Sequence, residues 1–588
     1  MLQYPIYTDE SECRGCYKCV GRCPVKSIRV KDGLTDIIPK ICIYCGNCVT
    51  SCPAGAKRVR NDIEKVQRLI NRGIKVYASL APSYAAEFYG SSPAQVIASL
   101  KKLGFAGISE TALGADFVSA DIAADLEKEP ENGQRLFLSS ACPSVVMYIK
   151  QNAPAYIPYL NDRASPLLSH ALFLRKIYGD KIAVVFIGPC IAKKREADQM
   201  REINAAITFA ELKQWFTQEG IIPENIEAKD NDNDFVPRRA AKGSYYPVDG
   251  GMILSLKSYQ SFSKGPTVSP GPTASPVSNM VVSGINTIAE LLHGNLAPEH
   301  LPAPLFLELL ACSGGCINGP CATRDTSAIM RRAQLLQYAQ AADDKLDPET
   351  LKDGVVPKAT LTLIEKPHVV FSVSEIRATL RKIGIYGEDD ALNCGQCGYE
   401  DCRSFAAAML EKRAEKVMCA SYMRNMAQRK ANAMIKTSPS GIVLVDKTLH
   451  VLESNKNFAR LMGKEIEELY ELIPELTGVN LNKIIDLVDY FEDALLAETA
   501  SSFDYDIRYN KKVLHLNVYV IEKGEVFAAV IDDITVPQVR RDKTVAKARK
   551  IIEKNVQAVQ KIAFLLGENA AETEAILNTI IESHSQGD

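Results

Sequence analysis

The sequence predicts a multidomain α/β protein: a central α/β domain with small cysteine-rich units on either side, followed by an α+β domain and a helical tail. Three observations lead to this prediction. The chain has 588 residues, which suggests about four domains. Apolar, strand-like runs alternate with helix-like segments from residue 58 to about 368, as in α/β folds. Sixteen of the 17 cysteines form four groups of four, all before residue 420.

The composition excludes several classes of protein. Apolar residues make up 46% and charged residues 24%, which is ordinary for a globular protein. No apolar run approaches the roughly 18 to 20 residues that span a membrane, and the N-terminus lacks the basic and apolar regions of a signal peptide. A net charge of −2 argues against nucleic-acid binding. We therefore expect a cytoplasmic protein with no membrane or nucleic-acid partner, whose cysteines serve metal binding or catalysis.

Residues 1–57 contain an internal repeat. The segments CRGCYKCVGRCP and CIYCGNCVTSCP both read C-x2-C-x2-C-x3-C-P. This pattern resembles two-cluster bacterial ferredoxins, in which the fourth cysteine of each run binds the other cluster. A zinc site is disfavoured because the whole pattern occurs twice. The resemblance implies two [4Fe–4S] clusters, one on Cys13, Cys16, Cys19 and Cys52, the other on Cys42, Cys45, Cys48 and Cys23.

Residues 58–368 are the predicted α/β domain. Its strand candidates are residues 74–80, 135–140, 181–188 and 305–311, and their continuous apolar character suits strands covered on both faces. Three of the four run directly into a cysteine segment. Ligands of open α/β sheets lie beyond the carboxyl ends of the strands, and helix N-termini there favour anions such as a thiolate-bound cluster. The predicted fold therefore gathers these cysteines at one site.

The three cysteine segments, SSACPS, GPCIAKKRE and ACSGGCING, together resemble the active-site signature of iron-only ([FeFe]) hydrogenases. The resemblance implies an H-cluster: a [4Fe–4S] cubane joined to a two-iron unit that carries CO, CN− and dithiolate ligands. Reversible H2 oxidation would follow, with H2, protons and a ferredoxin-like electron carrier as partners. The implied cubane ligands are Cys142, Cys190, Cys312 and Cys316, of which Cys316 also bridges to the two-iron unit.

Four further residues match family contacts to the two-iron unit or lie in the same motifs. Lys193, three residues after Cys190, matches the lysine that donates to one cyanide. Glu196 completes that motif, although it is equally suited to stabilising a helix N-terminus. Pro82 and Ser83 match the segment that faces the second cyanide.

Other positions depart from the family pattern. The cysteine that passes protons to the two-iron unit is replaced by Ala141, and Gly188 and Leu310 stand where methionines are usual. Leu167 replaces a glutamine, and Cys321 is a left-over thiol whose role stays open. Retained cubane ligands with a lost proton relay resemble the sensory branch of these hydrogenases, which implies slow turnover.

The remaining chain divides into three predicted units. Residues 369–430 resemble a small [4Fe–4S] module, with zinc as the alternative, and residues 431–536 resemble a PAS sensory domain. Residues 537–588 form a helical tail, which either packs on the protein or serves as a stalk for dimerisation or effector docking. The predicted ligands of the module are Cys394, Cys397, Cys402 and Cys419.

Three functional interpretations remain. The favoured one is a slow [FeFe]-hydrogenase that senses hydrogen or redox state and signals to an effector through its PAS domain or tail. The second is a metabolic, ferredoxin-linked bidirectional hydrogenase whose PAS domain is a docking module. The third is a cluster-carrying scaffold without the two-iron unit. Retention of Lys193 and Cys316 argues against the third, and Ala141 argues against the second.

Overall fold

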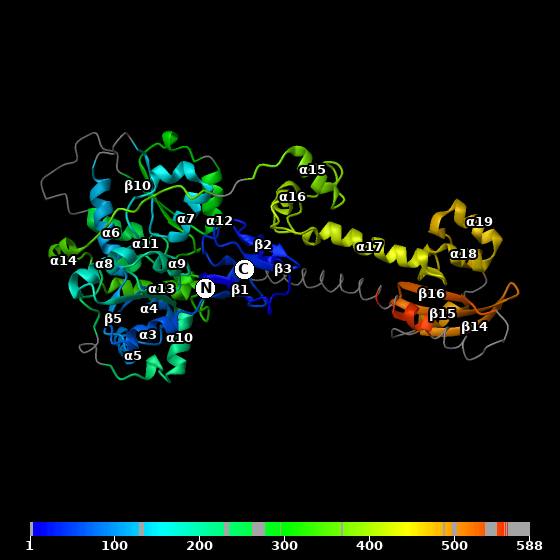
Figure 1. Cartoon of the computed structure of the whole chain (residues 1–588), viewed down its shortest axis with the longest axis horizontal. Coiled ribbons are helices and arrows are strands. Elements are labelled where there is room, and N and C mark those ends of the chain that lie inside the picture. The colour runs from blue at the N-terminus through cyan, green and yellow to red at the C-terminus, as the bar shows by residue number, and fades with distance from the viewer. Residues whose placement is uncertain are drawn as a thin grey trace. The chain divides into compact units, whose positions relative to one another are not determined.

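The computed structural model describes residues 4–128, 134–228, 234–260, 277–294, 296–365, 369–485, 489–496, 502–535, 550–557, 559 and 561. The chain separates into two compact units, Met1–Cys419 and Ala420–Asp588, and Figure 1 traces both. Within the described residues, no helix has the length and apolar character to cross a membrane.

The first segment repeats one small motif. Strand β1 (Ile6–Thr8) pairs with β4 (Lys57–Val59), and β2 (Ile28–Lys31) pairs with β3 (Leu34–Ile37), both antiparallel. Each cysteine run contains a four-residue helix that holds its third cysteine, α1 (Lys18–Gly21) and α2 (Asn47–Thr50). The residues that precede these helices adopt left-handed backbone conformations. The sequence repeat is therefore also a structural repeat.

The α/β part contains two parallel sheets (Figure 1). The first has the order β6-β5-β8-β9 and the second the order β10-β11-β7. The four predicted strands are confirmed to within two residues at each end, but they are divided between the two sheets. The strands are β5 (Val76–Leu80), β6 (Gly107–Glu110), β7 (Leu136–Leu138), β8 (Ala183–Gly188), β9 (Ala205–Thr208), β10 (Ser278–Ser283) and β11 (Leu305–Leu310).

Helices cover the first sheet, and α3, α5, α8 and α10 contact its strands. Strands β5, β6, β8 and β9 are buried along their whole length, as expected for a sheet that is covered on both faces. The helices are α3 (Ile63–Asn71), α4 (Tyr84–Glu87), α5 (Pro93–Lys102), α6 (Ala112–Leu126), α7 (Pro143–Asn152), α8 (Pro166–Tyr178), α9 (Ala192–Gln199), α10 (Phe209–Gln218), α11 (Gly251–Gln260), α12 (Ile285–His293), α13 (Ala328–Gln340) and α14 (Pro348–Asp353).

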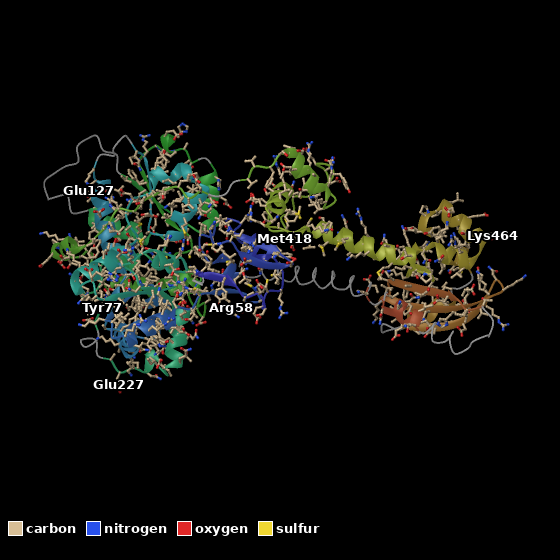
Figure 2. The ribbon with its side chains drawn as sticks, in the orientation of Figure 1. Arg58, Tyr77, Glu127, Glu227, Met418 and Lys464 are labelled. Carbon is tan, nitrogen blue, oxygen red and sulfur yellow. The ribbon has the colours of Figure 1, made fainter. Side chains whose placement is uncertain are left out.

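The last part of the first unit is small and helical. Helices α15 (Val373–Arg381) and α16 (Cys402–Leu410) pack together, and the segment ends at Cys419, beside the Met418 labelled in Figure 2. Asp401 caps α16 by accepting a hydrogen bond from the backbone N–H of Ser404. Helix α16 begins at Cys402, and the segment before it contains Cys394 and Cys397.

The second unit opens with α17 (Ala420–Thr437), which begins immediately after Cys419. A five-stranded antiparallel sheet follows with the order β13-β12-β16-β15-β14. Its helices lie between β13 and β14 along the chain. This is the α+β arrangement that the PAS resemblance predicts. The strands are β12 (Gly441–Asp446), β13 (Val451–Ser454), β14 (Ser502–Tyr509), β15 (Lys512–Glu522) and β16 (Val526–Asp533); the helices are α18 (Lys456–Met462), α19 (Lys464–Leu472) and α20 (Asp489–Leu496).

The predicted helical tail lies mostly outside the described residues. Residues 550–557 are helical, and the Asn555 side chain donates a hydrogen bond to Ser440 Oγ at 3.0 Å. This contact ties the described part of the tail to the start of the sheet domain.

Candidate metal centre

Three strands of the two sheets end at cysteine segments. Strand β8 leads to Cys190 and β11 leads to Cys312, with Cys316 one turn later. After β7, Cys142 directly precedes α7, whose first residue is Pro143. Proline suits this position because the first N–H groups of a helix have no partner inside the helix. Strands β7 and β11 are parallel neighbours in one sheet, so their carboxyl ends lie at the same edge. Cys190 follows β8 of the other sheet and meets Cys142 and Cys316 at one cavity, so the fold brings together cysteines that are distant in sequence.

The four thiols lie within electrostatic reach of one another. Burial, and to a smaller extent the neighbouring Cys142, raises the pKa of Cys190 to about 11. Burial also raises the pKa values of Cys312 and Cys316, and Cys142 and Cys190 contribute to both shifts. A metal binds thiolates, so binding here has to displace protons. Four thiols and no other donor type form the set that a [4Fe–4S] cubane takes.

A cavity of about 110 Å³ lies beside three of these cysteines, Cys142, Cys190 and Cys316. Its lining is mostly apolar, which excludes water, and includes Leu167, Phe186 and Leu310. The structure brings the predicted contact residues Pro82, Ser83, Ala141 and Lys193 to the same cavity. Glu196 is absent from the lining.

Two polar groups of this cavity fit an anionic ligand. The Lys193 ammonium is buried and forms an ion pair with Glu196 at 2.6 Å. Glu196 also accepts a hydrogen bond from the Ser165 hydroxyl, so its carboxylate is held next to the lysine. Ser83 Oγ is buried, and no other described group bonds to it. An unpaired buried hydroxyl is costly, so an acceptor in the cavity would satisfy it. These residues therefore fit the two-iron unit with its cyanide ligands.

Ala141 places a methyl group at the cavity wall, where it packs against the apolar cluster around Val118 and Phe306. Two carboxylates of α6, Asp121 and Asp125, both form ion pairs with Arg163 and are therefore neutralised.

Sequence reasoning missed two features of this region. The first is Tyr246, which lines the cavity and shares a hydrogen bond of 2.9 Å with the hydroxyl of Ser119. The second is Lys194, a fully buried lysine directly after Lys193. Two adjacent lysines in a segment that otherwise begins with apolar residues were the available signal, since consecutive residues of a helix lie about 100° apart around its axis.

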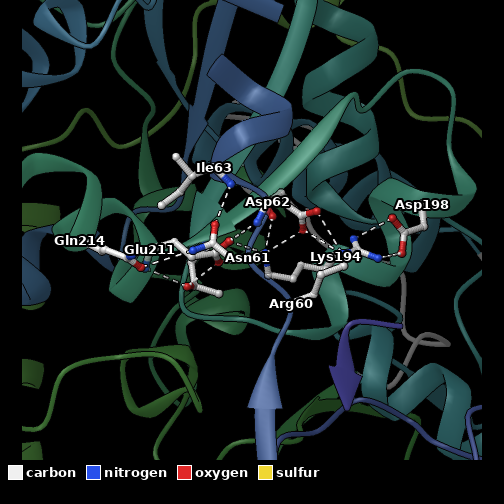
Figure 3. A network of polar contacts seen from close by, with 10 residues as sticks. Arg60, Asn61, Asp62, Ile63, Lys194, Asp198, Glu211 and Gln214 are labelled. Carbon is white, nitrogen blue, oxygen red and sulfur yellow. Dashed lines mark hydrogen bonds and ion pairs between the residues drawn. The ribbon is translucent and has the colours of Figure 1, made fainter. Parts of the chain in front are cut away.

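Lys194 anchors α9 (Figure 3). Its ammonium contacts Asp62 and Glu211 at 2.9 Å and the Ala206 carbonyl at 2.8 Å. On the same helix face, Asp198 accepts two hydrogen bonds from Arg60, at 2.8 and 2.9 Å. These contacts fix the orientation of α9, and therefore the direction in which Lys193 points, because both lysines belong to that helix.

The N-terminal cysteines also form groups. Burial raises the pKa values of Cys42, Cys45 and Cys48, and each is raised further by Cys23. This group adjoins the centre above, because Cys45 and Cys312 line a common cavity of about 480 Å³.

The other two groups are more exposed. Burial raises the pKa of Cys19, and Cys16 and Cys52 raise it to a smaller extent. The pKa of Cys13 is lowered, and a hydrogen bond with Thr35 contributes to that shift. In the last module, burial raises the pKa of Cys397, which Cys419, Cys394 and Cys402 raise further. No three Cys, His, Asp or Glu side chains among the described residues are placed to hold a single metal ion.

Comparison with known proteins identifies three matching regions. The model of the iron-only hydrogenase large subunit, C-terminal domain, matches residues 74–320. A 4Fe-4S dicluster domain matches residues 5–53, and an Fe-S cluster domain matches residues 390–421. Iron–sulfur clusters are thus the cofactors of this chain.

Two curated proteins and one solved structure illustrate the similarity. The periplasmic [Fe] hydrogenase large subunit of Nitratidesulfovibrio vulgaris is 28% identical over 369 residues, which are 53% of this chain and 85% of that protein. A probable cytosolic Fe-S cluster assembly factor of Drosophila persimilis is 23% identical over 274 residues, 37% of this chain and 55% of that protein. The structure of an [FeFe]-hydrogenase from Chlamydomonas reinhardtii is 19% identical, with a TM-score of 0.39 over 49% of this chain and 91% of that one.

Proposed function

Since the chain is an [FeFe]-hydrogenase-like protein, we propose that residues 58–368 bind an H-cluster and catalyse slow, reversible oxidation of H2. The observation that carries this proposal is the meeting of Cys142, Cys190 and Cys316 with Lys193 and Ser83 at one apolar cavity. When bound, the two-iron unit supplies the open metal position at which H2 is cleaved.

The residues of this chain would bind and orient that unit. Cys142, Cys190, Cys312 and Cys316 are the ligands we assign to the cubane, and Cys316 is its link to the two-iron unit. Lys193 would donate to one cyanide, and Glu196 fixes the lysine by the ion pair at 2.6 Å. Ser83, which lines the cavity beside Pro82, would donate to the second cyanide. The apolar walls exclude water, which strengthens each of these polar contacts.

Slow turnover follows from Ala141. A positioned proton donor typically contributes 10²- to 10⁴-fold to a rate, and a methyl group offers none.

A slow enzyme with a C-terminal α+β domain suits sensing better than metabolic flux. In this proposal three further [4Fe–4S] clusters, two in residues 1–57 and one in residues 369–430, link the centre to a ferredoxin-like carrier. Residues 431–536 act as a PAS domain that passes the redox state to an effector, directly or through the tail. The proposed location is the cytoplasm.

The similarity to cluster assembly factors supports one alternative, a scaffold that carries cubanes without the two-iron unit. The two functions differ in what the cavity holds. A scaffold requires neither the buried ammonium of Lys193 nor the unpaired hydroxyl of Ser83.

Infrared spectroscopy tests the proposal, because bound CO and CN− absorb where protein does not. Anaerobically matured protein should show these bands and catalyse slow H2-dependent dye reduction. Lys193→Ala should shift or remove the cyanide bands, whereas Lys181→Ala, at an exposed site after α8, should leave them unchanged. Matured protein without CO and CN− bands would support the scaffold instead.

A further inference from the structure

The module that holds the fourth cysteine group docks on the N-terminal segment through a row of specific contacts. The Lys26 ammonium donates to the Gly398 carbonyl at 2.8 Å. In return, Arg413 donates to the Lys26 carbonyl at 2.9 Å, and the Val30 N–H donates to the Arg413 carbonyl at 2.8 Å. These bonds join segments almost 400 residues apart in sequence, and the charged donors make two of them strong.

A carboxylate closes the other end of the row. Glu415 accepts hydrogen bonds from the backbone N–H groups of Asp32 and Gly33, at 2.7 and 3.1 Å. Both groups lie in the turn between β2 and β3. Glu415 therefore satisfies two donors of this turn at once, which fixes the module in orientation as well as position.

The closest approach lies between two cysteine groups. Gly398 has φ +85°, and a Cβ added there would come within 2.7 Å of the Gly21 backbone nitrogen. Only glycine permits both this conformation and this contact. Gly398 directly follows Cys397, and Gly21 comes two residues before Cys23. Cysteines of two different groups thus flank the point where the backbones touch.

We propose that the module is a side branch of the electron path, which exchanges electrons with the N-terminal cluster bound in part by Cys23. That cluster also adjoins the catalytic centre, since Cys45 and Cys312 line one cavity. It therefore stands at a junction, with the centre on one side and the module on the other. The assignment deepens the proposed function, because α17 begins directly after Cys419 and the module is the last redox group before the second unit.

The electrons balance with one-electron clusters. Oxidation of one H2 releases two protons and two electrons, and each [4Fe–4S] cluster accepts one electron on reduction from the 2+ to the 1+ state. One H2 therefore reduces the junction cluster and the module cluster together. Dithionite can replace H2 as the reductant, which makes the test independent of hydrogenase activity.

Electron paramagnetic resonance of the full-length protein tests the branch. In dithionite-reduced wild type, the module cluster should show spin–spin broadening from its neighbour. The double variant Lys26→Met/Glu415→Gln should lose this broadening while it retains its iron and its rate of H2-dependent dye reduction. The matched control is Lys40→Met/Glu10→Gln, which changes the same residue types at exposed positions and should keep the broadening.

Two results would overturn the branch: a wild-type spectrum that is the sum of isolated clusters, or coupling that survives in the double variant. H2 provides a second reading, since the module signal should appear several times more slowly in the variant than in wild type. If dithionite reveals coupling but H2 reduces no cluster, the docking is supported and the proposed hydrogenase function fails.

Discussion

Replacement of Lys194 by methionine should destabilise the first unit strongly. Lys194 is fully buried, and its ammonium is shared by two buried carboxylates, Asp62 and Glu211. Methionine fills a similar volume but leaves both carboxylates without that cation. Removal of one partner from a buried ion pair costs about 3–5 kcal/mol. With a urea m-value of about 3 kcal/mol/M, the unfolding midpoint should fall by about 1 to 1.7 M.

The single tryptophan makes this measurement local. Trp215 is buried on α10, the helix that carries Glu211, so its fluorescence reports unfolding of this region in the intact chain. Arg68→Gln is the control, because the Arg68–Glu64 pair is exposed and 3.7 Å apart. Exposed pairs contribute little to stability, so its midpoint should match that of wild type.

A second variant separates lost charge balance from lost packing. In Lys194→Met/Glu211→Gln, a neutral amide replaces the Glu211 carboxylate, and Asp62 keeps its contact with Arg60 at 3.0 Å. Part of the stability should therefore return. The reasoning is refuted if Lys194→Met unfolds at the wild-type midpoint, or if the double variant is less stable than the single one.

Three further outcomes are expected. Four cubanes and one two-iron unit correspond to about 18 iron atoms per chain. Elemental analysis of matured protein should approach this number. An iron content of about 14 atoms per chain together with bound zinc would show that the Cys394 module is a zinc site. Hydrogen exchange in residues 431–588 should differ between H2-reduced and oxidised protein, because a signal requires contacts that depend on state; identical exchange would leave this domain as a docking module. Dye-reduction assays should show H2 turnover about 10²- to 10⁴-fold below that of relatives with a cysteine at position 141, and Ala141→Cys should gain only modestly because it restores the thiol but not the rest of a proton relay. Wild-type turnover equal to that of fast enzymes would contradict this account.

Local spacing determined much of what the sequence reveals. The repeated C-x2-C-x2-C-x3-C-P pattern and the three strand-to-cysteine junctions depend only on residues near one another in the chain. Such patterns predicted the α/β fold class, the strands before the cysteines and the α+β domain that follows. They also singled out residues that line the cavity, including Lys193 and Ala141.

Contacts between distant segments were decided only by the tertiary structure. Apolar runs predict strands but not their partners, so the division of the strands into two sheets was not foreseen. Lys194 and Asp62 are 132 positions apart, and Lys26 and Gly398 are 372 positions apart. Neither pair carries a local signal, because an ion pair or a backbone contact depends on how complete elements pack. The sequence thus determined the chemistry that this chain carries, and the packing of its elements decided which cysteine groups lie side by side.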